Sequence, residues 1–135
     1  MDRYQKINQN IEAGYHQWHQ NKSIEACVSW LEAWEAIYIL LKETPMTLLE
    51  LQNAYPWSEH WFNYVQELGQ ELHNAGLDHK EYFRKRIRYC EELLEQKEVP
   101  EAIYEETRIA LAESYFQLGE IETAEKGYLR KRKKR

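Results

Sequence analysis

The sequence has little glycine, proline or cysteine, and it has no long apolar run. Its longest apolar run, AIYILL at 36–41, is far shorter than the about 20 residues that cross a bilayer. The first ten residues, MDRYQKINQN, lack the apolar core of a secretion signal. We therefore expect a soluble, cytoplasmic protein without a membrane partner.

The two cysteines are not arranged as a close pair. Cys27 and Cys90 both fall on stripes of apolar residues at helical spacing. Such positions are typical of reduced, buried thiols in a cytosolic protein and argue against a structural disulfide.

Motifs of catalysis are also missing. The sequence contains no Gly-rich phosphate loop, no nucleophile elbow and no His-Glu-x-x-His pair. Glu12, His16 and His19 recur at i, i+4 and i+7, a spacing that can present three ligands to a metal. Metal sites usually draw ligands from more than one element, which favours surface histidines. We expect no enzyme, no cofactor and no metal; an enzyme or metal-dependent protein would require a metal bound at these three residues.

Helix-forming residues dominate what is present. Apolar residues recur at three and four positions rather than two, and the length suits one domain. Eighteen aromatic residues must supply much of the core. The pattern predicts an all-α protein with helices at about 3–20, 23–43, 47–54, 58–75, 79–97, 100–118 and 120–131.

The predicted helix ends have recognisable chemistry. Thr47 with Glu50, and Asp78 with Glu81, match the capping box, and Ser58 can cap the helix that follows it. Two glycines fall just past predicted helix ends, where a left-handed residue is needed: Gly76 and Gly119.

The predicted helix 23–43 is apolar on two sides, which is typical of a helix packed between two neighbours. The first face consists of Ile24, Cys27, Val28, Leu31, Trp34, Tyr38 and Leu41. The second face consists of Ala26, Trp30, Ala33, Ile37 and Leu40.

The last predicted hairpin, ALAESYFQLGEIETAEKGY, resembles a tetratricopeptide repeat, in which small residues allow two helices to approach and aromatics fill the space between hairpins. Weaker versions of the same order of small and aromatic residues occur earlier in the chain. The chain is also similar to uncharacterised bacterial repeat proteins of this type. The matching residues are Leu111, Ala112, Tyr115, Gly119, Ala124 and Tyr128; Leu68, Gly69, Leu72, Gly76, Phe83, Ile87 and Cys90; and Gly14, Asn21, Lys22, Ala26, Trp30 and Ala33.

The resemblance implies a right-handed stack of about three antiparallel helical hairpins forming one domain over residues 1–129. It also implies a non-catalytic scaffold that holds a peptide or a partner helix in a concave groove lined by the first helix of each hairpin. The middle set of lining residues is amide or imidazole, which suits a peptide backbone; simple solvation of these side chains is the alternative. The implied groove residues are Asn8, Tyr15, Trp18 and His19; Asn63, Gln66, Gln70, His73 and Asn74; and Glu106, Glu113, Phe116 and Gln117.

Charge is distributed unevenly. The basic tail 130–135 holds six of the eighteen Lys and Arg, so residues 1–129 carry twelve bases against twenty-three acids, a net charge of −11. The tail is either a natural extension or the place where a longer array was cut, and the uncovered Ile121, Ala124 and Tyr128 favour the cut. These residues also predict self-association through the last hairpin, with the acidic body complementing the tail.

A nucleic-acid-associated protein is the alternative function. Its contacts would come from the tail and from a basic ridge in KEYFRKRIR, although this ridge can instead pair with the acids of EVPEAIYEE. The candidate contacts are Lys80, Arg84, Lys85, Arg88, Arg130, Lys131 and Arg132.

Overall fold

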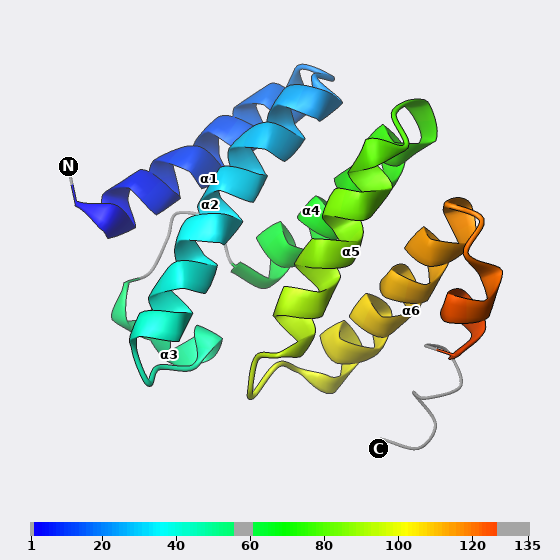
Figure 1. Ribbon diagram of the computed structural model, residues 1–135. Coiled ribbons are helices and arrows are strands. Elements are labelled where there is room, and N and C mark those ends of the chain that lie inside the picture. Colours follow the sequence, from blue (N-terminus) through cyan, green and yellow to red (C-terminus); the bar gives the residue numbers. More distant parts are fainter. Residues whose placement is uncertain (1, 56–60, 127–135) are drawn as a thin grey trace. The chain divides into compact units, whose positions relative to one another are not determined.

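The computed structural model describes residues 2–55 and 61–126, and these residues are helical with no strand (Figure 1). This confirms the all-α prediction. The chain divides into two compact units, Met1–Glu71 and Leu72–Arg135. The helices are α1 (Arg3–His19), α2 (Ser23–Glu43), α3 (Leu48–Ala54), α4 (Trp61–Asp78), α5 (Glu81–Leu94) and α6 (Glu101–Gln117), and residues 121–126 are also helical.

The first unit is built on the hairpin of α1 and α2. Asn21 adopts a φ of 62° in the turn between them, where the sequence predicted a turn. Trp30 of α2 is fully buried, and its Nε1 donates to the backbone carbonyl of Ile11 at 3.0 Å. On the other side of α2, the hydroxyl of Tyr64 in α4 donates to the carbonyl of Trp30 at 2.7 Å. Trp30 therefore joins three helices of this unit.

The burial of α2 agrees in part with two apolar faces. Both faces contribute buried residues, since α1 packs on one side and the first turns of α4 on the other. Val28, however, is 47% exposed, and Leu31 and Tyr38 are half-buried. The first predicted face is therefore only partly covered in the described residues.

One of the two predicted capping boxes is confirmed. The Thr47 side chain accepts from the Glu50 amide, and the Glu50 carboxylate accepts from the Thr47 amide. The box at Asp78 and Glu81 is wrong, because α4 continues through Asp78 and α5 starts after Lys80 with no side-chain cap. The predicted cap Ser58 lies outside the described residues.

The two predicted helix-ending glycines have different roles. Gly119 has a φ of +81° after α6, as predicted. Gly76 lies inside α4 and is not left-handed, so the prediction for it is wrong. A Cβ at position 76 would stand 2.8 Å from the Phe83 ring of α5, so glycine allows these two helices to approach closely.

The second unit contains the last turns of α4 with α5, α6 and the helical segment 121–126. Phe83, Tyr89, Cys90 and Leu93 of α5 are buried in its core. In the last hairpin, Ala124 is buried rather than uncovered, whereas Ile121 is 41% exposed. The third residue of that predicted apolar face, Tyr128, lies outside the described residues.

Candidate partner-binding surface

Exposed side chains form a continuous stripe along α6, which we call the α6 face: Ala102, Glu106, Ile109, Glu113 and Phe116. Their spacing of three and four residues places them on one side of the helix. Two are large and apolar, and Ile109 and Phe116 remain 45% and 59% exposed. Two carboxylates, Glu106 and Glu113, alternate with them along the helix. The face therefore offers apolar contact and negative charge together.

A second stripe, on α4, is mainly amide. The exposed residues at helical spacing along this helix are Asn63, Gln66, Gln70, Asn74 and Leu77. His73 lies beside them and is half-buried. All five α4 residues that the sequence predicted for the groove therefore lie on or next to this stripe.

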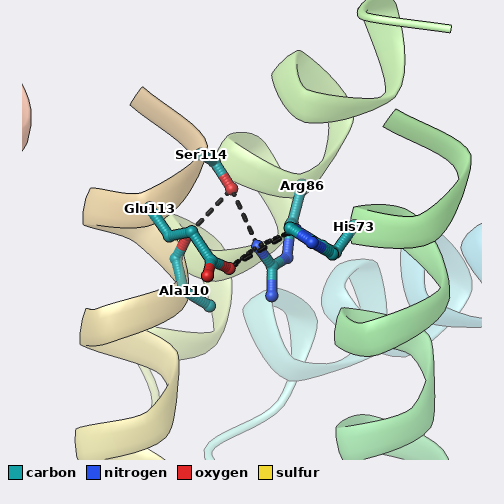
Figure 2. Close-up of polar contacts among 5 residues, drawn as sticks. All are labelled: His73, Arg86, Ala110, Glu113 and Ser114. Atoms are coloured by element: carbon teal, nitrogen blue, oxygen red, sulfur yellow. Dashed lines mark hydrogen bonds and ion pairs between the residues drawn. The ribbon is translucent and has the colours of Figure 1, made fainter. Parts of the chain in front are cut away.

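The α6 face is held to its neighbours by a polar network in the second unit (Figure 2). Arg86 of α5 is only 5% exposed, and its Nη1 donates to Glu113 Oε1 at 2.7 Å. The same nitrogen lies 3.4 Å from Ser114 Oγ. Ser114 in turn donates to the carbonyl of Ala110 at 2.8 Å. A buried guanidinium requires such partners, because leaving the cation unpaired away from water is costly.

His73 brings α4 into this network. Its Nδ1 lies 3.4 Å from Arg86 Nη1 and 3.4 Å from Glu113 Oε1. Only one of these contacts can be a hydrogen bond at a time, since Nδ1 either accepts from the guanidinium or donates to the carboxylate. The structure thus brings together His73 and Glu113, two residues that were predicted for one groove from different hairpins.

The predicted groove residues of the first hairpin differ from one another in burial. Tyr15 is buried, with its ring 5.0 Å from that of Trp30 and its hydroxyl 3.5 Å from Glu67 Oε1. Trp18 is half-buried beside it, with a ring distance of 6.0 Å. His19 is exposed. Tyr15 therefore packs inside the first unit.

The remaining predicted groove residues are polar and accessible or partly so. Asn8 is half-buried, and its amide donates to Glu12 Oε1 at 3.4 Å. Glu106 and Gln117 are exposed on α6.

The histidines of α1 are not assembled into a metal site. Glu12, His16 and His19 are all exposed, and His16 Nε2 contacts the Gln20 amide at 3.3 Å. Within residues 2–55 and 61–126, no three His, Cys, Asp or Glu side chains form a group that could hold a metal ion.

Both thiols are buried and free, as their apolar positions predicted. Burial, with a smaller contribution from Glu71, raises the pKa of Cys27 from 9.0 to about 12. Burial likewise raises the pKa of Cys90 to about 12, although nearby Arg86 acts in the opposite direction. Since the thiolate is the nucleophile, neither cysteine is poised for thiol chemistry near neutral pH.

The basic ridge of α5 is exposed, and part of its charge is already paired. Arg84 forms an ion pair with Glu120, and Arg88 pairs with Glu92 at 3.2 Å. Lys85 lies over the Tyr82 ring at 5.7 Å. These partners lie outside the stretch EVPEAIYEE that the sequence suggested. Lys80 is also exposed, and the other candidate contacts, Arg130, Lys131 and Arg132, lie outside the described residues.

Two parts of this surface were missed in the sequence. Arg86 is three residues after Phe83 and four before Cys90, so it lies on the buried side of α5. A cation at such a position signals a carboxylate on a neighbouring helix. Ile109 was also missed, although it completes the spacing of Glu106, Glu113 and Phe116.

A shallow groove of about 380 Å³ lies apart from these residues, between α1 and α2. Arg3 and Lys6 line one wall, and Glu32 and Glu35 line the other. None of the predicted groove residues lines it.

Comparison with protein-family models, with curated proteins and with solved structures finds no match for this chain. In the part of the chain that the structure describes, no helix is long and apolar enough to cross a membrane.

Proposed function

We propose that this chain is a non-catalytic protein-interaction scaffold of the tetratricopeptide-like class, in which helical hairpins stack and present a peptide-binding surface. The exposed α6 face carries the proposal. Phe116 and Ile109 offer apolar area that water does not favour, while Glu106 and Glu113 give direction to a bound segment. A helix or an extended peptide of a partner protein is the occupant that such a stripe fits.

The close helix contacts support the repeat-like class. Gly14 lies against Trp30, at a position where the resemblance places a small residue, and Gly76 lies against Phe83. The hydrogen-bonded network around Arg86 supports binding as well. It fixes Glu113 in place before a partner arrives, and preorganised groups lose less conformational freedom on binding.

A capture experiment with three full-length chains tests this function. Wild type, Phe116→Ala and Leu49→Ala would be used as baits in nuclease-treated cell extract, and captured proteins would be identified by mass spectrometry. Leu49 of α3 is also an exposed large apolar residue, outside both stripes. We expect a protein that wild type and Leu49→Ala retain and Phe116→Ala loses; equal capture by all three chains would contradict the proposal.

Nucleic-acid binding is the second candidate, favoured by the exposure of Lys80, Arg84, Lys85 and Arg88 along α5. It ranks lower because Arg84 and Arg88 already contact carboxylates and because the rest of the chain is acidic. Binding to phosphates would weaken steeply with added salt. A salt titration with a labelled oligonucleotide would distinguish it from binding through the α6 face.

A further inference from the structure

We infer that the α6 face binds the basic segment 127–135 of a second copy of this chain, so that copies associate head to tail. The inference rests on the proposed function of the α6 face and names a partner for it. Its basis is the chemistry of the face and the charge of the chain.

The first argument is the order of apolar and acidic groups on the face. Glu106 and Glu113 are seven residues apart, as are Ile109 and Phe116, so the two kinds of group interleave over about three helical turns. A matching ligand carries large apolar side chains next to several cations. Segment 127–135, GYLRKRKKR, has Tyr128 and Leu129 followed by six cations and no acid.

The second argument is the state of the Glu113 carboxylate. In the described part of the chain, its ion pairs with Arg86 and His73 both involve Oε1. The side chain remains 45% exposed. The second oxygen, Oε2, can therefore accept from an incoming Lys or Arg without displacing the guanidinium of Arg86. Glu106 offers a further exposed carboxylate about two turns away along α6.

Every copy of the chain carries both the α6 face and the basic segment, so one copy can supply the segment to the face of another. Binding within one copy would leave the wild type monomeric in low salt, and the sedimentation test below separates the two arrangements.

Such an interface joins two different surfaces and is therefore heterologous, so it can continue from copy to copy. Its charges lie at an exposed surface, where salt screens them beyond about 10 Å at 0.1 M ionic strength. We expect association that grows with concentration and weakens as salt is added.

The test uses sedimentation velocity of nuclease-treated full-length chains in low and high salt. One variant, Glu106→Lys with Phe116→Ala, damages the face; a second replaces the six cations of 130–135 with Gln. We expect wild type to associate in low salt and each variant alone to have about tenfold weaker association or more, as for loss of close charge pairs. Mixing the two variants should restore a 1:1 heterodimer, because one supplies an intact segment and the other an intact face.

Two further variants control for other surfaces. Leu49→Ala should associate like wild type. Ile121→Ala should do so too, because Ile121 lies in the helical segment 121–126 and not on the α6 face. Loss of association in Ile121→Ala, persistence in both damaged variants, failure of the mixture, or a wild type that stays monomeric in low salt would each overturn the inference. The capture experiment reads binding to other proteins, so it can succeed even if self-association fails.

Discussion

Gly14 lies so close to Trp30 that a Cβ at position 14 would stand 2.1 Å from the indole Nε1. That nitrogen is fixed by its hydrogen bond to the carbonyl of Ile11 at 3.0 Å. The contact between α1 and α2 therefore depends on the absence of a side chain at residue 14.

Replacing Gly14 with Ala should reduce the free energy of unfolding by about 3 kcal/mol, because the added methyl group overpacks a buried site. Urea denaturation followed by circular dichroism measures this. Gly119→Ala is the matched control: a Cβ there would meet no atom of the described residues within 4 Å, but the residue has a φ of +81°. It should cost only about 1 kcal/mol, from backbone strain. Equal costs would show that Trp30 can move aside.

The Arg86–Glu113 pair should respond unequally to loss of each partner. Glu113→Gln removes the anion of this pair from a buried cation, and should cost about 2 kcal/mol of unfolding free energy, less than a fully buried pair because Glu113 is half-exposed. Arg86→Met leaves a carboxylate that water can reach and should cost about 1 kcal/mol. The double variant should resemble Arg86→Met. A larger cost for Arg86→Met than for Glu113→Gln in urea denaturation would contradict this.

Two phenylalanines should separate the core from the surface. Phe83 is 1% exposed, and its ring fills the space that a side chain at position 76 would need. Phe83→Ala should therefore lower the free energy of unfolding by about 3–5 kcal/mol. Phe116→Ala should change stability by less than about 0.5 kcal/mol, as for other surface substitutions. Both values come from the same urea titrations. A large loss in Phe116→Ala would mean that this residue stabilises the fold and would weaken its role as a binding residue.

Stability should fall in alkaline solution because of the two thiols. Burial raises the pKa of Cys27 and Cys90 from 9.0 to about 12 in the folded chain, so the unfolded chain releases these protons first. The thiols therefore leave stability unchanged below pH 9 and reduce it as the pH rises from 9 towards 12. Denaturation midpoints at several pH values measure the slope.

A Cys27→Ala, Cys90→Ala chain is the control for this slope. It should keep a flatter profile between pH 9 and 10. Above that range its stability should still fall, because burial also raises the pKa of Tyr64 well above 10.0. Identical profiles for the two chains would show that the thiols are not the cause.

Much of the local structure could be predicted from the sequence. Apolar spacing placed the helices to within a few residues, and the capping box at Thr47 and Glu50 and the left-handed Gly119 were read correctly. These features depend on residues within one or two turns of each other. The stripes on α4 and α6 follow from the same period once a helix is assumed.

The tertiary structure decided the contacts between residues far apart in the chain. Gly76 looked like a helix end, but the Phe83 ring beside it shows a packing role. The basic run at 84–88 predicted an exposed ridge of Arg84, Lys85 and Arg88, but it did not show that Arg86 points inward to Glu113, 27 residues away. Local periodicity fixes which residues share a helix face. Which faces then meet depends on packing between helices, and this set the partners of Arg86, the neighbours of His73 and the exposure of Phe116.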